Sequence, residues 1–195
     1  FTNHDLLSAI AATGKPLIAS TGMATELEIS AGIRHLRQQG AAFALLHCNS
    51  TYPTPFKDVN LRYLRRLAEL AEAPVGYSGH ERGFAVPIAA VSLGAAVIEK
   101  HITLDQGMEG NDHKVSLLPE EFTAMVAGIR AVEESMGSES PRSISQGELM
   151  NREILAKSLV AACPIAAGTP ISREMVRIQS PGQGLQPYRL NDLIG

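Results

Sequence analysis

The chain has 195 residues, of which 45% are hydrophobic and 19% are charged, and its formal net charge is −3. This composition is typical of a folded globular chain with one domain and room for a small second one, not of a disordered polymer. The small negative charge, the scattered Lys and Arg residues and the absence of Trp argue against a nucleic-acid partner. No run approaches the roughly 18 apolar residues that a membrane span needs, so we expect no membrane association.

The two cysteines, Cys48 and Cys163, stand far apart and outside any Cys-x-x-Cys pair. This spacing disfavours a zinc ribbon and a disulfide scaffold, and it fits a reducing, cytoplasmic compartment. Cys48 lacks an evident basic neighbour, so we expect it to be a small buried residue and not a reactive thiol. The chain begins at Phe1 without a signal-peptide pattern, and we expect it to begin inside a longer protein.

Four short apolar segments with polar C-terminal ends predict strands buried on both faces, at residues 16–20, 42–47, 74–78 and 96–101. Apolar residues at helical spacing predict helices at residues 25–38, 58–71, 84–93 and 119–136. This alternation predicts an α/β fold with a parallel sheet and crossover helices. A doubly wound sheet and a (β/α)8 barrel both fit. No glycine-rich dinucleotide loop follows a strand, and polar residues gather at the strand ends, which favours the barrel.

Residues 137–150 are rich in Gly, Ser and Pro and predict a linker between a first domain, residues 1–136, and a second, residues 151–195. In the second domain, residues 157–162 predict a strand, residues 172–175 a capped helical turn and residues 181–184 a further turn. The second domain is therefore expected to be a small β-rich module.

His80 and His101 follow two consecutive predicted strands. Adjacent parallel strands would bring both imidazoles to one edge of the sheet, where they could share a divalent cation and leave positions open for substrate and water. The alternative is two unrelated histidines, one capping a helix and one packed inside, because most histidines bind nothing. His47, at the end of another predicted strand, is either a third ligand or a hydrogen-bonding residue just below the edge.

Small polar residues follow the other strands. Asn49, Ser50 and Tyr52 lie in a loop that could hold a phosphate or carboxylate, or that could merely cap the next helix. Ser20 and Gly22 precede a helix, where glycine would let the backbone approach an anion. Asp112 could bind sugar hydroxyls or act as a general base, although exposed loop acids are usually only solvated.

Six short motifs carry a more specific signal when they are taken together. In this order and at these spacings, they resemble the sialic acid synthase (N-acetylneuraminate synthase) family over about residues 15–118: Ala19–Met23, Leu45–Cys48, Tyr52–Pro55, Gly76–His80, Glu99–Thr103 and Asn111–His113. Beyond residue 150, Gly168–Ile171 and Ser180–Gly182 resemble the antifreeze-like (SAF) domain that follows the barrel in this family.

The resemblance implies the C-terminal half of a (β/α)8 TIM barrel, strands five to eight, followed by a truncated SAF domain. It implies condensation of phosphoenolpyruvate with N-acetylmannosamine or a related amino sugar, giving a nine-carbon α-keto acid and phosphate. The alternatives are a synthase for legionaminate or pseudaminate, and a non-catalytic carbohydrate-binding protein built from the same barrel. A Schiff-base aldolase is disfavoured, because Lys100 points away from His101 on a pleated strand.

The resemblance also implies roles for single residues. A divalent metal, Mn²⁺ with Mg²⁺ or Co²⁺ as alternatives, would be held by the pair matching His80 and His101. By position, Ser20, Ser78 and the pair Asn49–Ser50 resemble ligands of phosphoenolpyruvate, and Tyr52 and Asp112 resemble contacts to the sugar. The expected catalytic residues are thus His80, His101 and Asp112. The family further implies a domain-swapped homodimer whose SAF domain covers the partner's active site.

Three features depart from the family pattern. The early barrel strands, with the lysines that bind phosphoenolpyruvate and an acidic catalytic residue, are not in these 195 residues, so we expect no activity unless those parts are supplied elsewhere. Gly79 and Ser50 stand where many bacterial members have Asp and Asn, with Asn49 one place earlier. Ser180 replaces an arginine that reaches the sugar's acyl group, and Arg177 or Arg189 could substitute for it.

Overall fold

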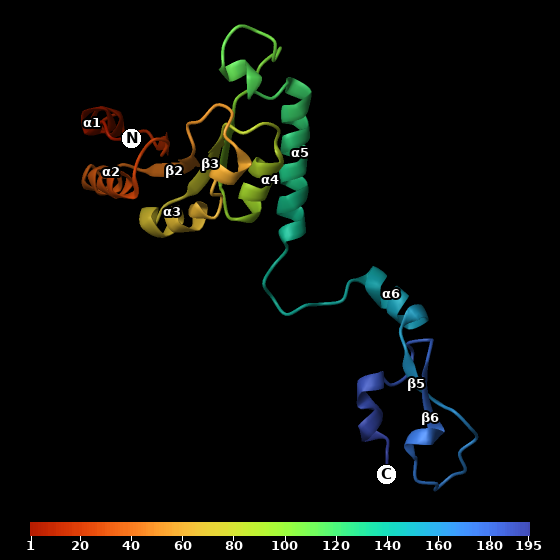
Figure 1. The fold of residues 1–195 in the computed structure, drawn as a ribbon. Helices are drawn as coiled ribbons and strands as arrows, with labels where there is room; N and C mark the ends of the chain where they lie inside the picture. Colours follow the sequence, from red (N-terminus) through yellow and green to blue (C-terminus); the bar gives the residue numbers. More distant parts are fainter. The chain divides into compact units, whose positions relative to one another are not determined.

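A computed structural model describes residues 1–195 as two compact units, Phe1–Ser138 and Glu139–Gly195 (Figure 1). The helices of the first unit are α1 (His4–Ala11), α2 (Glu26–Gln38), α3 (Tyr63–Ala71), α4 (Ala85–Ser92) and α5 (Pro119–Met136). Its strands are β1 (Leu17–Ser20), β2 (Phe43–Cys48), β3 (Val75–Gly79) and β4 (Val97–Lys100). Two short 3₁₀ helices, η1 (Phe56–Asp58) and η2 (Asp112–Lys114), lie in the loops after β2 and β4.

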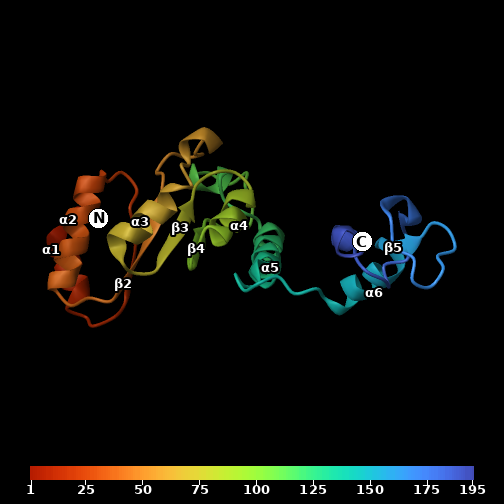
Figure 2. The same ribbon diagram turned by 90° about the horizontal axis from the view of Figure 1, so that it is seen from below.

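The four strands form one parallel sheet in the order β1-β2-β3-β4. A helix follows each strand and the helices pack against one face of the sheet, which is the arrangement of half a TIM barrel and agrees with the C-terminal half that the resemblance implies. Figure 2 shows α1 beside α2 at one end of this unit and α5 at the other. All four strands end at the same edge of the sheet, because parallel strands share a direction.

The register of the sheet separates its two faces. Residues paired in register share a face, so Leu45, Val75 and Tyr77 lie together on one side. These three residues pack with α2 and α3 in the main hydrophobic core, against Ile33 and Leu67. The opposite face carries Ser20, Cys48, Ser78 and Glu99 at the strand ends. The helix-covered face is therefore the core, and the other face presents polar groups.

Side-chain caps fix where several helices begin. Thr25 and Glu28 form a reciprocal capping box at the start of α2, with the Thr25 N–H donating to Glu28 Oε2 over 2.7 Å. The predicted helix 58–71 is shorter than expected: it begins only at Tyr63, because Asn60 adopts a left-handed φ of 50° that interrupts the turn after η1. Helix α1, capped by Asn3, was not anticipated from the sequence.

The second unit contains α6 (Gln146–Leu155), the antiparallel strands β5 (Ser158–Ala161) and β6 (Val176–Gln179), and the 3₁₀ helices η3 (Arg173–Met175) and η4 (Pro187–Asp192). Helix α6 starts inside residues 137–150, where only a linker was predicted. A capping box of Ser145 and Glu148 nucleates it. No helix in the chain combines the length and the apolar character needed to cross a membrane.

Gly76 sets the spacing between β3 and β4. A Cβ at this position would lie 2.2 Å from the backbone oxygen of Val97, so Gly76→Ala would push the two strands apart. We expect this variant to lose about 1–3 kcal/mol of unfolding free energy in denaturant titrations. Gly147→Ala is the matched control, because nothing lies near its Cβ, and it should be neutral or slightly stabilising. Equal stability of both variants would contradict the tight contact.

Candidate active site

His80 and His101 lie one residue beyond the last paired residues of β3 and β4, which are Gly79 and Lys100. Their ring centroids are 5.1 Å apart and the ring planes are nearly perpendicular. His80 is buried, with 5% of its surface exposed, and His101 is partly exposed. The parallel pairing thus brings the two predicted histidines together at one edge of the sheet.

The His80 ring has a defined orientation. Its Nδ1 lies 2.7 Å from the backbone oxygen of Asn49. A carbonyl oxygen only accepts, so Nδ1 carries the proton in this bond and Nε2 keeps its lone pair. The hydroxyl of Tyr52 lies 3.1 Å from that Nε2. The nitrogens of His101 form no hydrogen bond with the protein. Each ring therefore offers one nitrogen that can bind a cation.

The donor set fits a cation site that is open to small molecules. No group of three or more His, Cys, Asp or Glu side chains in this chain could hold a metal ion by itself. An ion held by His80 and His101 would complete its coordination with water or with oxygen atoms of a substrate. The carbonyl behind Nδ1 of His80 is the kind of outer hydrogen bond that orients metal-binding imidazoles. The residues present are thus compatible with a divalent metal.

His47 does not belong to this pair. It lies on the helix-covered face, 8% exposed, and its Nε2 donates to the backbone oxygen of Val59 over 2.6 Å. Its ring is tilted against Tyr63 and Tyr77. Of the two roles that the sequence allowed, the structure shows the hydrogen-bonding one. Burial lowers the pKa of His47, because a charged imidazole would be poorly solvated there.

Cys48 lies closer to the histidines than the sequence suggested. Its Sγ is 3.8 Å from His80 Nδ1 and 3.8 Å from Ser50 Oγ, so the prediction that it lacks a basic neighbour is wrong. Burial raises the pKa of the Cys48 thiol, but the hydrogen bonds from His80 and Ser50 outweigh it and the net pKa is lowered. The same contact with Cys48 raises the pKa of His80 against the opposing effect of burial.

The predicted substrate ligands divide into free and engaged groups. Ser20 is exposed at the end of β1 and forms no side-chain hydrogen bond. The Ser78 hydroxyl is buried and donates to Glu99 Oε1 over 3.2 Å. The Asn49 amide is occupied within its own loop, donating to the Asp58 oxygen and accepting from the Thr51 N–H, each over 3.0 Å. Ser20 is thus free for a ligand, whereas Asn49 would have to exchange partners.

Tyr52 lies among acidic groups near the histidines. Its ring centroid is 4.2 Å from that of His80 and 5.8 Å from that of His101. Burial, and then the negative charges of Cys48, Asp112 and Glu99, raise the pKa of Tyr52. Asp112 is exposed in η2. Glu99 was not selected from the sequence, although its place two residues before His101 on a pleated strand puts both on one face.

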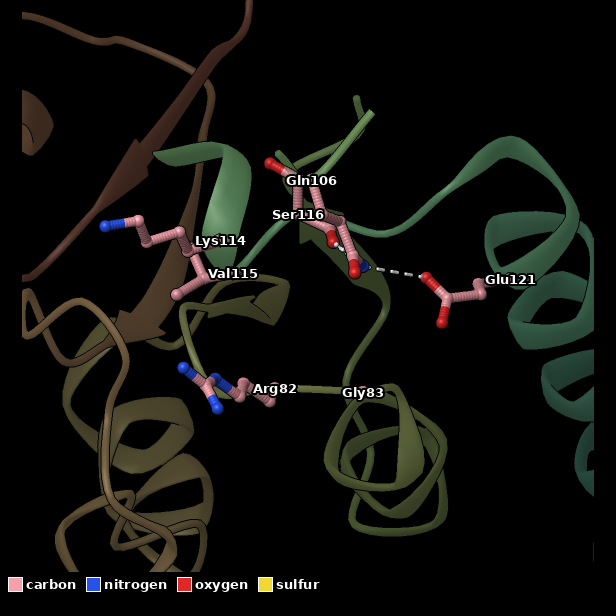
Figure 3. A pocket seen from close by; sticks show the side chains of 7 residues that line it. All are labelled: Arg82, Gly83, Gln106, Lys114, Val115, Ser116 and Glu121. Atoms are coloured by element: carbon pink, nitrogen blue, oxygen red, sulfur yellow. Dashed lines mark hydrogen bonds between the residues drawn. The ribbon is translucent and has the colours of Figure 1, made fainter. Parts of the chain in front are cut away.

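A polar pocket of about 430 Å³ lies among the loops at the same end of the sheet (Figure 3). It is formed by the loops after β3 and β4 and the first turn of α5, and its lining residues are Arg82, Gly83, Gln106, Lys114, Val115, Ser116 and Glu121. Figure 3 shows Gln106 bridging to Glu121, at 3.3 Å, with Arg82 and Lys114 on the other side. Neither histidine lines this pocket, so it extends the polar surface without being the proposed cation site.

A buried ion pair lies behind the histidines on the helix-covered face. Lys100 Nζ is 2.9 Å from Glu81 Oε1, and both side chains are fully buried. The Tyr77 hydroxyl donates to Glu81 Oε2 over 2.5 Å. Burial lowers the pKa of Lys100 despite the partner carboxylate, and burial with the Glu81 hydrogen bond raises the pKa of Tyr77. Lys100 is therefore engaged away from the histidines, as the pleat predicts.

The comparisons with known proteins decide the family. The NeuB family model matches residues 1–141, and the SAF domain model matches residues 156–195. The chain belongs to the NeuB family.

Relatives of this NeuB chain are named as synthases of different products. It is 40% identical to N,N'-diacetyllegionaminic acid synthase of Campylobacter jejuni, over 100% of the chain and 59% of the relative. It is 37% identical to human N-acetylneuraminate-9-phosphate synthase, over 99% of the chain and 54% of the relative. The chain thus spans somewhat more than half the length of these relatives.

The fold of this NeuB chain has solved counterparts. The crystal structure of N-acetylneuraminic acid (sialic acid) synthetase from Leptospira borgpetersenii serovar Hardjo-bovis in complex with citrate superposes with a TM-score of 0.70 at 34% identity. That match covers 78% of this chain and 54% of the Leptospira chain. The likeness supports the half-barrel description of the first unit.

The depressed pKa of His47 predicts a stability change with pH. Above about pH 6.5 the imidazole is neutral in both the folded and the unfolded chain, so its contribution is complete. As the pH falls below that value, the unfolded chain takes up a proton that the folded chain excludes, and the free energy of unfolding decreases. Denaturant titrations at about pH 7.5 and about pH 5 should show a smaller loss in His47→Gln than in the unaltered protein. An identical loss in both would contradict this prediction.

Proposed function

We propose that this chain carries the cation-binding half of a nonulosonic acid synthase that condenses phosphoenolpyruvate with an amino-sugar aldehyde and releases phosphate. The observation that carries the proposal is the meeting of His80 and His101 at adjacent strand ends, in a chain of the NeuB family. The names of the relatives support the product class, because they include legionaminic, pseudaminic and sialic acid synthases. N-acetylmannosamine, or a related amino sugar, is the proposed acceptor.

Different residues at this edge of the sheet would bind the cation and the phosphoenolpyruvate. His80 Nε2 and one His101 nitrogen would hold a divalent cation, with Mn²⁺ the first choice, while Asn49 O keeps the His80 ring in place. Such an ion, when bound, would polarise the aldehyde oxygen of the sugar. Ser20, exposed at the end of β1, offers a free hydroxyl donor to the anionic groups of phosphoenolpyruvate, and Ser78 on the same face would have to exchange its bond to Glu99 for such a group.

The sugar would contact the loops above this edge. The Tyr52 hydroxyl is within reach of His80 and can exchange that bond for a sugar hydroxyl. The Asp112 carboxylate is exposed and forms no side-chain hydrogen bond, so it is free to accept from sugar hydroxyls or to take up a proton. We further propose that a homodimer forms, with the SAF unit of one copy covering the site of the other.

A non-catalytic carbohydrate-binding protein is the alternative from another class. Binding of a sugar alone does not require two imidazoles side by side, one of which, His80, is held in a fixed orientation by the Asn49 carbonyl. The synthase proposal therefore accounts for more of the site.

Replacing either histidine tests the proposal. In the complete gene product, His80→Ala and His101→Ala should each weaken Mn²⁺ binding by more than about 100-fold, because each removes half of the protein ligands. Phosphate release from phosphoenolpyruvate and an amino sugar should fall about 10³-fold, since a Lewis acid contributes several kcal/mol to the barrier. A panel of N-acetylmannosamine, its 6-phosphate and diacetylated amino sugars would identify the acceptor.

His47→Gln is the matched control, because it alters a histidine on the opposite face of the same sheet. It should leave Mn²⁺ binding unchanged. If the unaltered protein binds no divalent metal and releases no phosphate with any sugar, the carbohydrate-binding alternative is favoured.

The position of Ser180 allows a test of sugar contacts from the SAF unit. Ser180 Oγ accepts from Lys157 Nζ over 2.8 Å, and Arg189 is paired with Asp192 at 2.9 Å. Arg177, on β6, forms no ion pair and is thus the better candidate to reach the sugar. We expect Arg177→Ala to raise the KM for the sugar about tenfold without changing that for phosphoenolpyruvate, because one charge-assisted hydrogen bond would be lost. An unchanged sugar KM in both Arg177→Ala and Arg189→Ala would dismiss the idea.

A further inference from the structure

The ion pair of Glu81 and Lys100 joins the two residues that adjoin the histidines in sequence. Glu81 follows His80, and Lys100 precedes His101. Beside the 2.9 Å contact with the carboxylate, the Lys100 ammonium donates to the backbone oxygen of Glu81. The lysine thereby holds both the side chain and the main chain of the residue after His80.

The Glu81–Lys100 ion pair lies at the point where the hydrogen-bonded pairing of β3 and β4 ends. The last register pair of β3 and β4 is Gly79 with Lys100, so no pairing between these strands fixes His80 relative to His101. The ion pair crosses from one strand end to the other at this point. Tyr77 anchors the second carboxylate oxygen, so both oxygens of Glu81 have a partner. The buried ion pair therefore links the residue after His80 directly to the residue before His101.

Stability alone is a weak reason for such a pair. Removing two charges from water carries a desolvation cost that offsets much of their attraction, and an apolar pair of similar volume is often as stable. Both side chains here are fully buried, so that cost applies in full. A role in positioning the neighbouring residues explains why charged groups stand at this place.

The space beside Gly79 is the second place from which a side chain could bring a carboxylate to Lys100. A Cβ on Gly79 would lie 2.9 Å from both carboxylate oxygens of Glu81 and 2.7 Å from Cε1 of Tyr77. Its φ is not positive, so the backbone itself would accept any L residue. Gly79 is also the register partner of Lys100, and paired residues in a parallel sheet project to the same side. The Glu81 side chain thus occupies the space of a side chain at position 79.

We propose that Glu81 and Lys100 are positioning residues for the His80–His101 cation site, and that position 79 is glycine because position 81 supplies the carboxylate. This rests on the proposed function only in that the two histidines bind a divalent metal. It follows that an acidic residue at position 79 can replace Glu81 but cannot coexist with it.

Three variants of the complete gene product test this: Glu81→Ala, Gly79→Asp and the double variant Gly79→Asp/Glu81→Ala. The Mn²⁺ dissociation constant is measured by titration of the free-ion electron paramagnetic resonance signal, and the melting temperature is measured without metal. Glu81→Ala should weaken Mn²⁺ binding about 10- to 100-fold, the usual effect of losing an outer-shell partner. The double variant should return to within about fivefold of the unaltered protein, because the carboxylate again faces Lys100.

Gly79→Asp alone should be the least stable variant, because it places two carboxylates and a colliding Cβ in one buried space. Glu26→Ala is the control, because it breaks an exposed ion pair with Arg66 that is remote from the histidines. It should change neither quantity appreciably.

The outcomes separate the two claims. If the unaltered protein binds no Mn²⁺, the proposed function fails and this inference fails with it. If that protein binds but Glu81→Ala lowers only the melting temperature, the pair is structural and the positioning role is overturned. Should Glu81→Ala not fold, the double variant decides: recovered folding and Mn²⁺ binding support the inference, and failure to recover either one overturns it.

Discussion

His80 and His101 meet because β3 and β4 run in the same direction and end level with each other, with Gly79 paired to Lys100. In a parallel sheet, residues that follow neighbouring strands reach the same edge without any long connection. The distance between the imidazoles thus starts from the strand spacing, which can be small because Gly76 has no Cβ to collide with the Val97 oxygen. Every other feature of the candidate site is arranged around that separation.

The pleat of the sheet gives its two faces different chemistry. Ser78 and Glu99 project to the open face, toward the same side as the histidines, whereas Tyr77 and Lys100 project to the helix-covered face. Open polar groups can exchange partners with a ligand, but a buried group must keep its partner or leave a charge unsatisfied. Alternate residues of these short strands therefore face either the candidate site or the buried contacts with the helices.

Much of this arrangement could be predicted from the sequence. The four parallel strands and the approach of His80 to His101 follow from apolar segments with polar ends, because that pattern depends only on local periodicity and on parallel topology, whereas the assignment to the C-terminal half of a barrel came from the resemblance. Helix α5 also begins and ends where the pattern indicates, at Pro119 and Met136. The sequence did not predict helix α6, because the composition of residues 137–150 outweighed the capping signal at Ser145.

Other features depend on contacts that no local pattern reveals. The sequence indicates only that Glu81 lies in a loop, yet its carboxylate folds back over Gly79 to reach Lys100. Cys48 approaches His80 only because β2 and β3 are adjacent and the His80 ring turns toward the Asn49 loop. Both facts require the tertiary packing of side chains that are distant in sequence.

Gly22, just after the first strand, leaves a space that the loop after the second strand fills. A Cβ there would lie 2.2 Å from Ser50 Oγ, and Ser50 follows Asn49, whose carbonyl accepts the hydrogen bond from His80 Nδ1. A larger residue at position 22 would collide with Ser50 and displace that loop, and with it the carbonyl that holds the His80 ring. The residues at positions 22 and 50 therefore occupy one shared space, so a larger side chain at position 22 requires a smaller one at position 50.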